Sequence, residues 1–394
     1  MKDVVIVSAA RTPICDFGGA LKDVSAREMG ELVVREVIKR AGIEPYMVDE
    51  VIFAKARQAG QGPNIARQIS VGAGIPVEKP AYTVNQACLS SVQSLILAYK
   101  SIVLGDADIV VAGGTESMSR VPYMLDRARF DGYRLGHGTL IDGMYQDGFL
   151  DPLSGQLMGR TAENLVEMYN ITREEQDAYA LESHRRAVGA KKDGRFVEEI
   201  VPVPVRGKRG EVTLVKEDEH PREDASLDKM AKLPPVFKEG GTVTAGNSSA
   251  ITDGAAALLV MSKERAKGLG IEPMAKVGPY TVVGVEPRIM GIGPVPATKK
   301  LLAKTGMKLS DFELIELNEA FAAQVLAVAR ELPFDFEKTN VNGGAIALGH
   351  PIACTGARLV TTLLYEMKRR NLSTGLVTLC VSGGMGGSIV FFRE

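Results

Sequence analysis

The stretch YTVNQACLSSVQSLILAYKSIVLGDADIVVAGG, residues 82–114, decides the fold. It starts as an extended run, turns through small polar residues around Cys88 and continues as an amphipathic helical pattern. The apolar face of that pattern consists of Val92, Leu95, Ile96, Tyr99 and Val103. The stretch ends in DIVVAGG, residues 108–114, a short apolar run without the polar alternation of a half-exposed strand. This order predicts a strand, a helix and a second strand buried on both faces.

The same alternation recurs along the chain. Short apolar runs are found at residues 4–7 (VVIV), 256–261 (AALLVM), 376–381 (LVTLCV) and 388–392 (SIVFF). A second amphipathic helix is predicted near the C-terminus, with Leu359, Val360, Leu363, Leu364 and Met367 on one face. We therefore expect an α/β fold with helices packed on mixed, mostly parallel sheets. The two ends of the chain share this outline, which indicates an internal duplication into two similar βαβ-type halves.

The middle of the chain has a different character. Residues 119–249 contain turn-rich and charged stretches, and the buried-strand composition returns only at residues 256–261. We predict an N-terminal half made of residues 1–118 and 250–269, an inserted loop domain over 119–249, and a C-terminal half over 270–394. Within the insert, the charged stretch KRGEVTLVKEDEHPRED, residues 208–224, is expected to be a solvated face or hairpin, with a phosphate contact as the alternative.

Composition excludes several classes of function. The 394 residues carry 47 Lys and Arg against 48 Asp and Glu, a net charge of -1, with 6% aromatic residues and no Trp, so nucleic acid is a poor candidate partner. No apolar run reaches the roughly 18 residues of a membrane helix. The N-terminal apolar stretch is too short for a signal peptide, so we expect a cytoplasmic protein. The four cysteines show neither disulfide-scaffold nor zinc-site spacing, so no metal is expected.

Cys88 is the first candidate for chemistry. Its predicted position at a strand-to-helix turn lies near free backbone N–H groups and the positive end of the helix dipole. A thiol has a pKa of about 8.5, and a useful nucleophile needs a drop of roughly 2 units, about 2.7 kcal/mol. A helix terminus supplies about 0.3 to 1 kcal/mol and at best about 2. The position at a helix terminus is therefore insufficient to lower the pKa of Cys88 by this amount, and the thiol requires a basic partner.

Among the four histidines, His350 is the candidate partner. It lies in NGGAIALGHPIACTGARLV, residues 342–360, where glycines permit a tight backbone path and Pro351 restricts the preceding residue. The alternative is a structural loop histidine. His137, His184 and His220 are interpreted as surface residues.

Two further side chains stand at the ends of predicted strands. Cys380 precedes SGGMGGS, a turn whose backbone N–H groups are suited to an oxyanion, although a plain hairpin or a nucleotide-binding loop fits the same pattern. Asn318 lies in ELIELNEAFAAQVLAVA, where an asparagine is ordinarily a helix N-cap and can also be a fixed donor at a site.

These blocks together resemble the thiolase family over essentially the whole chain. Four blocks carry the active-site part of the resemblance: NQACLSS (85–91), NEAFAAQ (318–324), GHPIACTGAR (349–358) and CVSGGMGG (380–387). Five others agree with it: AGGTESMSRVPYML (112–125), MGRTAENL (158–165), ITREEQDAYALESHRRA (171–187), TVTAGNSSAITDGAAA (242–257) and MGIGPVPA (290–297).

The resemblance implies an acyl-CoA acetyltransferase of the thiolase fold, usually a homodimer or homotetramer, whose inserted domain binds coenzyme A as a substrate and which needs no cofactor. It implies that Cys88 is the acylated nucleophile, His350 its base and Cys380 the acid/base at the substrate α-carbon. Asn318, through a water, and His350 are implied to form one oxyanion hole, and the backbone N–H groups of Cys88 and Ser382 the other. The implied coenzyme A contacts are Leu157, Met158, Arg222, Phe237, Ser249 and Phe321.

The chain departs from the family pattern at several positions. Ser90 and Ser91 stand where Ser-Gly is usual, and Ser382 replaces a glycine, which is tolerable only if the turn needs no glycine-only backbone angle. Cys354 is expected to be a packing residue. Leu157 stands where acetoacetyl-specific members carry His, which leaves the preferred acyl chain length open.

The expected reaction is the reversible condensation of two acetyl-CoA to acetoacetyl-CoA and CoA through acyl-Cys88, with direction set by metabolite levels. A 3-oxoacyl-CoA thiolase for longer chains is the alternative in the same family. A condensing enzyme of fatty-acid or polyketide synthesis is disfavoured because such enzymes commonly have His or Asn in place of Cys380. The third reading is a non-catalytic acyl-CoA or lipid-binding protein on a thiolase scaffold.

Overall fold

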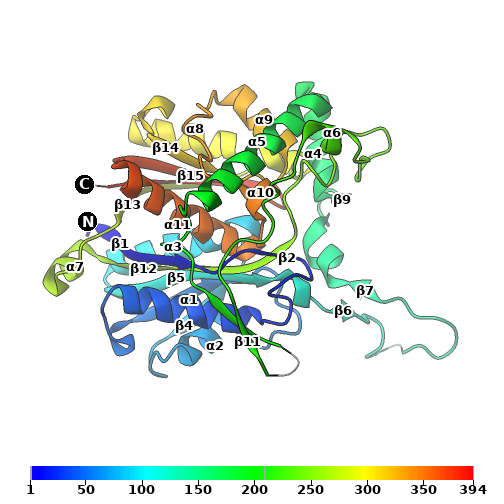
Figure 1. Ribbon diagram of the computed structural model, residues 1–394. Coiled ribbons are helices and arrows are strands. Elements are labelled where there is room, and N and C mark those ends of the chain that lie inside the picture. Colours follow the sequence, from blue (N-terminus) through cyan, green and yellow to red (C-terminus); the bar gives the residue numbers. More distant parts are fainter. Residues whose placement is uncertain (1, 131, 208–209, 394) are drawn as a thin grey trace.

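The computed structural model describes residues 2–130, 132–207 and 210–393 (Figure 1). The N-terminal half contributes β1 (Val4–Arg11), β2 (Cys15–Asp16), β3 (Glu50–Ala54), β4 (Ala81–Val84), β5 (Ile109–Ser117) and β12 (Thr252–Ser262). The C-terminal half contributes β13 (Ala275–Gly284), β14 (Leu314–Leu317), β15 (Thr374–Val381) and β16 (Met385–Phe392). Over the described ranges these ten strands form one sheet in the order β14-β15-β16-β13-β1-β12-β5-β3-β4, with β2 paired to β12. All five predicted apolar runs are strands of this sheet.

The two halves repeat one strand arrangement. In the N-terminal half β3 is parallel to β5, which is antiparallel to β12, which is antiparallel to β1. In the C-terminal half β14 is parallel to β15, which is antiparallel to β16, which is antiparallel to β13. The halves meet where β1 pairs antiparallel with β13. This repetition agrees with the predicted internal duplication.

The prediction of a mostly parallel sheet is wrong. Among the described strands of the main sheet, three pairings are parallel and six are antiparallel. Strands buried on both faces have the same unbroken apolar composition whichever way their neighbours run, so composition could not reveal direction. Parallel pairs occur where a helix connects the strands, whereas β15 and β16 are joined by a tight turn.

Helices cover the sheet in layers. Figure 1 shows α1 (Ala26–Arg40) and α2 (Ile65–Gly72) on the outer face of the N-terminal half, and α8 (Pro294–Thr305) and α9 (Ala322–Glu331) on the outer side of the C-terminal half. Between the halves lie α3 (Ser90–Leu104) and α11 (Ile352–Arg370), which contact each other. Both helices were predicted, and their apolar faces belong to the central core. Their side-by-side packing brings residues from opposite halves together.

The register of β1 illustrates how one strand serves two cores. Val5 and Val7 face the core beneath α1, while Val4 and Ile6 face the central core with α3 and α11. Burial of both faces explains why the strand shows no polar alternation.

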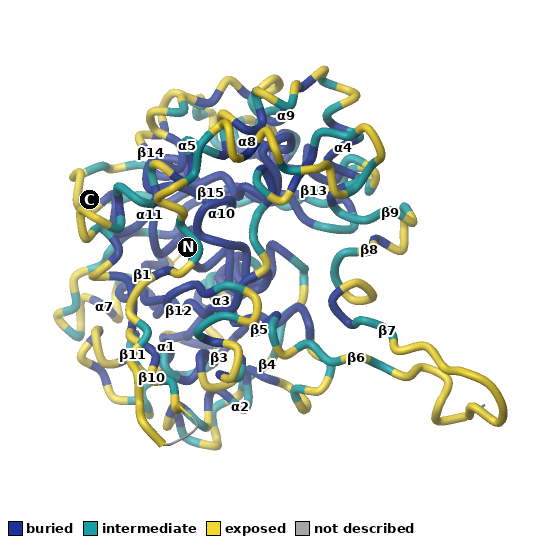
Figure 2. The backbone as a smooth tube through the Cα atoms, turned by 45° about the vertical axis from the view of Figure 1, so that its right-hand side comes forward, coloured by how far each residue is buried: buried dark blue, intermediate teal, exposed yellow. Residues whose placement is uncertain are grey.

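Residues 119–249 contribute no strand to the main sheet in the part of the chain that is described. Their helices are α4 (Met158–Tyr169), α5 (Arg173–Lys192) and α6 (Leu227–Ala231). Their short strands form three hairpins, β6 (Tyr123–Met124) with β7 (Ile141–Asp142), β8 (Leu150–Asp151) with β9 (Gln156–Leu157), and β10 (Val203–Arg206) with β11 (Val212–Val215). The described residues between β6 and β7, 125–130 and 132–140, project from the body and are largely exposed (Figure 2). The limits of the inserted domain stay a prediction.

The charged stretch 208–224 is divided between two environments. Residues 212–215 are strand β11 of an exposed hairpin, as expected, and residues 208 and 209 lie outside the described residues. Asp218, in contrast, is buried.

One described helical segment, Ala87–Leu104, is long and apolar enough to cross a membrane, judged by length and composition alone. Just over half of it is buried inside the structure. This segment is no uninterrupted apolar run, because serines and Lys100 stand among its apolar residues.

Candidate active site

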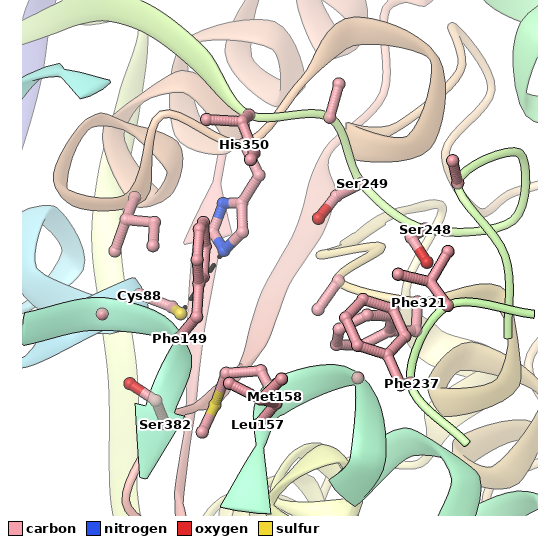
Figure 3. Close-up of a pocket in the computed structure, with 18 of the residues that line it drawn as sticks. Cys88, Phe149, Leu157, Met158, Phe237, Ser248, Ser249, Phe321, His350 and Ser382 are labelled. Atoms are coloured by element: carbon pink, nitrogen blue, oxygen red, sulfur yellow. Dashed lines mark hydrogen bonds between the residues drawn. The ribbon is translucent and has the colours of Figure 1, made fainter. Parts of the chain in front are cut away.

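A cavity of about 420 Å³ lies between the two halves and the inserted segment. Figure 3 shows Cys88 and His350 on one side of it and Phe237 and Phe321 on the other. Of the predicted site residues, those that line the cavity are Cys88, Leu157, Met158, Arg222, Phe237, Ser249, Phe321, His350, Cys380 and Ser382. Its wall is mainly apolar with a few convergent polar groups, the usual form of a small-molecule site.

Cys88 lies at the predicted turn between strand and helix. It is in a 3-10 turn, Ala87–Leu89, that leads from β4 directly into α3. Ala87 has a φ of 46°, which is unusual for a residue with a Cβ. Local bonds hold this conformation, because Asn85 Oδ1 accepts the N–H of Ala87 at 3.0 Å and Ser90 Oγ donates to the Ala87 carbonyl at 2.6 Å. The strained turn presents the Cys88 thiol to the cavity.

His350 faces Cys88 from the other half of the molecule. Its Nε2 lies 3.4 Å from Cys88 Sγ, and its Nδ1 lies 2.6 Å from Thr355 Oγ1. Thr355 Oγ1 donates its one hydrogen to the Pro351 carbonyl at 3.1 Å, so it accepts from His350 Nδ1. This assigns the proton of the neutral ring to Nδ1 and leaves Nε2 as an acceptor for the thiol proton.

Burial keeps both groups neutral before substrate arrives. Desolvation raises the pKa of Cys88, opposed by the backbone N–H groups of Ser382 and Cys88 and by the positive charge of Arg57. Desolvation, together with the charges of Arg57 and Arg358, lowers the pKa of His350 to about 3. The resting pair is therefore a thiol and a neutral imidazole, rather than a preformed thiolate and imidazolium.

Cys380 lies at the end of β15, where the cavity meets the turn to β16. Burial, and then the nearby Cys88, raise the pKa of the Cys380 thiol far above its ordinary value. In the turn, Gly383 and Gly384 have φ values of 84° and 82°, whereas Ser382 has no positive φ. The serine therefore occupies a position that needs no glycine, and its N–H points toward the Cys88 sulfur.

Asn318 follows β14 and is completely buried, but it is not on the cavity wall. Its side-chain Nδ2 and Oδ1 have no partner among the described protein atoms. Its backbone N–H donates to the Thr378 carbonyl at 3.0 Å, which fixes it beside β15. The N-cap of α9 is Phe321, so Asn318 is not a helix cap. An unsatisfied buried amide is consistent with the water-holding role that the resemblance implies.

The cavity opens through an apolar channel formed by the inserted segment and by Phe321 of the C-terminal half. Phe237 and Phe321 pack edge to face with ring centroids 6.1 Å apart. Gly159 permits this arrangement, because a Cβ at that position would lie 2.2 Å from the Phe237 ring. Arg222 is exposed and supplies positive charge. The channel can accept a long, flexible, largely apolar arm that ends in anionic groups.

Two of the three histidines interpreted as surface residues are not at the surface. His184 is 3% exposed and its pKa is lowered by burial to about 4. His220 lines the cavity, with Nδ1 2.6 Å from Asp16 Oδ1. His137 is exposed, as expected. The charged neighbours of His184 and His220 suggested a solvated segment, but Asp16 lies over 200 positions from His220 and gave no local signal.

Other wall residues were also missed. Tyr145, Gly148 and Phe149 line the cavity, and the short run that contains them resembles ordinary loop sequence. Ile352 also lines the cavity; it lies in the block around His350, but an isoleucine there gave no signal of its own. Cys354 is fully buried in the central core, consistent with packing, and burial raises its pKa to about 12. Among the described residues, no group of three or more His, Cys, Asp or Glu side chains is arranged to hold a metal.

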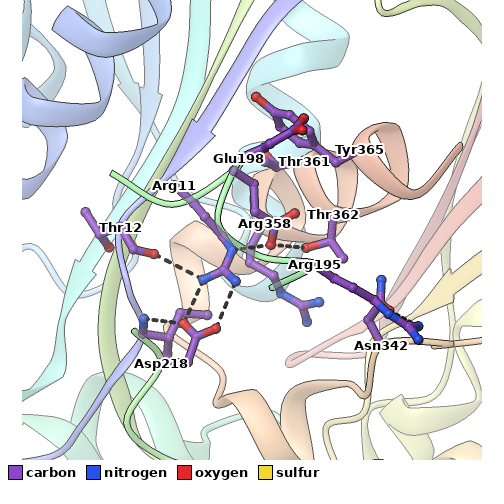
Figure 4. Close-up of polar contacts among 12 residues, drawn as sticks. Arg11, Thr12, Arg195, Glu198, Asp218, Asn342, Arg358, Thr361, Thr362 and Tyr365 are labelled. Carbon is purple, nitrogen blue, oxygen red and sulfur yellow. Dashed lines mark hydrogen bonds and ion pairs between the residues drawn. The ribbon is translucent and has the colours of Figure 1, made fainter. Parts of the chain in front are cut away.

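A buried arginine, Arg11, is one of the residues that attach the inserted segment to the N-terminal half (Figure 4). Arg11 Nε donates to Glu199 Oε1 at 2.6 Å, and its two terminal nitrogens donate to the Asp218 carboxylate at 2.7 and 2.9 Å. Asp218 is two residues before His220 and four before Arg222, so this ion pair positions the cavity wall.

Comparisons with known proteins agree with this arrangement. The thiolase N-terminal domain model matches residues 4–264 and the thiolase C-terminal domain model matches residues 271–393. The chain is 53% identical to an acetyl-CoA acetyltransferase of Syntrophomonas wolfei over 99% of this chain and 98% of that one. The crystal structure of the Bacillus anthracis acetyl-CoA acetyltransferase aligns with a TM-score of 0.98 at 47% identity, covering 100% and 99% of the two chains. Human mitochondrial 3-ketoacyl-CoA thiolase in complex with CoA aligns with a TM-score of 0.95 at 39% identity, covering 100% and 98%. The fold, the joining of two similar halves and these full-length matches establish that the chain belongs to the thiolase family.

Proposed function

We propose that this protein is an acetyl-CoA acetyltransferase that interconverts two acetyl-CoA with acetoacetyl-CoA and CoA through an acyl-Cys88 intermediate. The observation that carries the proposal is the 3.4 Å contact between His350 Nε2 and Cys88 Sγ in a cavity that also contains the Cys380 thiol. The full-length relatives named acetyl-CoA acetyltransferase support the choice of substrate.

In the first half-reaction, His350 Nε2 takes the Cys88 proton as the sulfur attacks the thioester carbonyl. The carbonyl oxygen becomes negative in the tetrahedral intermediate, near the backbone N–H groups of Cys88 and Ser382. The bond from the carbonyl carbon to the CoA sulfur breaks, and Cys380 gives its proton to that sulfur. Acyl-Cys88, CoA, an imidazolium and a Cys380 thiolate result.

In the second half-reaction, the Cys380 thiolate takes the α-proton of a second acetyl-CoA. The raised pKa of Cys380, caused by burial, suits this step because a more basic thiolate is a better acceptor for a weakly acidic C–H proton. The enolate attacks the acyl carbon, a C–C bond forms, and the Cys88 sulfur leaves and recovers its proton from His350. Asn318 and His350 are the proposed donors to the enolate oxygen, Asn318 through a water.

Coenzyme A is a substrate in this scheme, and we propose that no cofactor is needed. Leu157, Met158, Phe237, Ser249 and Phe321 are the proposed contacts of the pantetheine arm, and Arg222 is the proposed contact of an adenine or phosphate group. The apolar channel walls and the exposed guanidinium support this division.

Exchange of label between acetyl-CoA and CoA tests the proposal, since it needs only the first half-reaction. Cys88→Ala should abolish exchange, because no acyl-enzyme can form. Cys15→Ala is the matched control, since Cys15 is a buried cysteine outside the cavity and its variant should exchange label normally. Undiminished exchange in Cys88→Ala would refute the assignment.

A second candidate, a 3-oxoacyl-CoA thiolase for longer chains, is favoured by one observation. Leu157, together with Phe149 and Ile352, makes the cavity wall apolar where a larger acyl group could lie. Thiolysis rates across 3-oxoacyl-CoA chain lengths, measured with wild type and Leu157→His, separate the candidates. One methylene in an apolar pocket changes kcat/KM by about 10- to 200-fold. We expect Leu157→His to reduce activity on long chains more than on acetoacetyl-CoA; identical chain-length profiles would exclude a role for Leu157.

We also propose a cytoplasmic homodimer or homotetramer. The exposed apolar side chains of Tyr123, Leu125, Phe130, Leu135 and Leu140 support assembly. Light scattering on the purified chain tests the assembly directly, and a monomer at micromolar concentration would contradict it.

A further inference from the structure

Arg57 is a buried cation that forms no ion pair with any acidic side chain of the described residues. Only 3% of the residue is exposed, and neither Nε nor Nη2 has a hydrogen-bond partner among the described protein atoms. A buried charge is costly unless it is paired, so an unpaired guanidinium indicates that another group supplies negative charge nearby during function.

The fold brings Arg57 to the side of Cys88. Arg57 follows β3 and Cys88 follows β4, and these strands are parallel neighbours with Ala54 opposite Val84. The carboxyl ends of parallel strands share one sheet edge, so the segments that follow them lie together. Asn85 Nδ2 donates to the Ala56 carbonyl at 3.2 Å and ties these two segments.

The guanidinium itself packs behind the cavity wall. Its Cζ lies 5.8 Å from the ring centroid of Phe149, and a Cβ added to Gly148 would lie 1.9 Å from Nη2. Gly148 and Phe149 both line the cavity, and Figure 3 shows Phe149 beside Cys88. Phe149 and Ala56 also pack in one apolar cluster with Cys88, which excludes water from this region.

The carboxylate of Glu116, which accepts the backbone N–H of Arg57, pairs with another cation. Glu116 forms a fully buried ion pair with Lys55. The same carboxylate accepts backbone N–H groups from Ala56 at 3.1 Å and from Arg57 at 3.2 Å. The formal charges of Lys55, Arg57 and Glu116 therefore leave one positive charge next to the nucleophile.

The remaining groups that face the sulfur do not supply a resident anion. Burial keeps His350 neutral and the Cys380 thiol protonated. Arg358, which acts on His350 from α11, is a further cation, and its own partner is Glu316 at 3.4 Å. A thiolate at Cys88 is thus the anion that would neutralise the surplus charge.

We propose that Arg57 is a positioning residue whose charge stabilises the thiolate of Cys88 as it forms. The inference rests on the proposed role of Cys88 as nucleophile. No covalent bond to Arg57 is involved: the thiol S–H bond breaks, the proton moves to His350 Nε2, and the electron pair stays on sulfur in the field of the guanidinium. The positive charge of Arg57 acts to lower the pKa of Cys88 against the larger effect of burial, in agreement with this placement.

Alkylation of Cys88 by iodoacetamide measures this effect without turnover, because only the thiolate reacts. Rates between about pH 6 and pH 10, with the Cys88 adduct quantified by mass spectrometry, give the pH profile. An opposite charge nearby typically lowers a pKa by about 1 to 3 units, so Arg57→Met should move the profile up by about 1 unit, a roughly tenfold slower alkylation below the midpoint.

Three variants make the result specific to charge. Arg57→Lys keeps the charge and should retain most of the wild-type profile. Arg57→Gln is neutral and polar, and it supplies the same comparison if the methionine variant does not fold. Arg330→Met is the control for the substitution itself, since Arg330 is half exposed and pairs with Glu175 on another helix; its profile should match wild type.

Coinciding profiles for the neutral and charged variants at position 57 would overturn the proposal. An unshifted profile with a loss of rate confined to acyl-CoA substrates ending in a carboxylate would also overturn it, and would assign Arg57 to substrate binding. Because alkylation reports the thiol whether or not the enzyme turns over, failure here is distinguishable from failure of label exchange.

Discussion

His350 Nε2 lies 3.4 Å from Cys88 Sγ although 262 positions separate the two residues. The contact exists because Cys88 precedes α3 and His350 precedes α11, and these helices pack together between the two halves. The duplicated architecture therefore supplies one member of the pair from each half. Neither half alone contains the thiol together with its base.

Thr355 is predicted to control the orientation of this base. Thr355→Val removes the hydroxyl that accepts from His350 Nδ1 and keeps the shape of the side chain. A positioned general base contributes about 10²- to 10⁴-fold, and we expect at least about tenfold of this to be lost from kcat, with little change in KM. Thr355→Ser keeps the hydroxyl and should remain near wild type in the same assay. Equal activity of the two variants would show that the Thr355 hydroxyl does not orient the ring.

The turn after Cys380 predicts losses of stability of different size at two positions, Gly384 and Ser382. Gly384 has a φ of 82°, and a Cβ there would lie 2.3 Å from the Val285 carbonyl oxygen, so Gly384→Ala should lower the free energy of unfolding by at least about 2 kcal/mol. Ser382 has no positive φ, so Ser382→Gly should cost only about 0.5 to 1 kcal/mol and should keep label exchange close to wild type. Urea unfolding measures both. Equal losses would mean that the backbone angles do not set the requirement for glycine.

The buried His184 predicts a loss of stability in mild acid. Its folded pKa, about 4, lies below the ordinary value of 6.5, so between these pH values the unfolded state binds the proton and the folded state does not. The contribution of His184 to the free energy of unfolding is fully present above pH 6.5. It falls as the pH drops toward 4, by up to about 1.4 kcal/mol per pH unit. His350, whose pKa is also lowered by burial, acts in the same direction.

His184→Gln isolates the contribution of His184. Urea unfolding at a series of pH values should give a shallower acid slope for this variant than for wild type. Exposed His137 is the control, because His137→Gln should leave the slope unchanged. A slope in His184→Gln as steep as in wild type would contradict the prediction.

Local sequence patterns are sufficient to predict the elements that position Cys88 and His350. The strand-to-helix turn at Cys88 and the helix after His350 follow from apolar periodicity and from glycines and Pro351, which act over a few residues. Their meeting was inferred from chemistry, because a helix terminus alone cannot activate a thiol sufficiently. The structure refines that inference, since burial leaves both groups neutral until substrate binds.

The features that the sequence did not predict depend on residues that are distant in the chain. The direction of the strands was mispredicted because burial on both faces gives parallel and antiparallel strands the same composition. His220 was misplaced because its partner Asp16 is remote in sequence, and Arg57 attracted no attention because its significance lies in the absence of a partner among the described residues. Such features depend on tertiary packing, which no local pattern encodes.

The last prediction concerns Arg11, which attaches the inserted segment to the N-terminal half. Arg11 is fully buried between Glu199 and Asp218 (Figure 4). Burial raises the pKa of Glu199, the charge of Arg11 counteracts part of that rise, and the charge of Asp218 adds to it. Arg11→Met leaves two buried carboxylates without their cation. Breaking a buried ion pair in this way costs about 3 to 5 kcal/mol, which urea unfolding should detect.

Lys2→Met is the control for this loss, because Lys2 pairs with Asp108 at the surface and such pairs contribute about 0 to 1 kcal/mol. The position of Asp218, just before His220 and Arg222, adds a functional expectation. If the ion pair fixes this part of the cavity wall, the charge-conserving variant Arg11→Lys, which loses the two-pronged contact with Asp218, should raise KM for CoA more than it lowers kcat. Loss of kcat with unchanged KM would place the effect at the Cys88 and His350 pair and would refute a role for Arg11 in holding the wall.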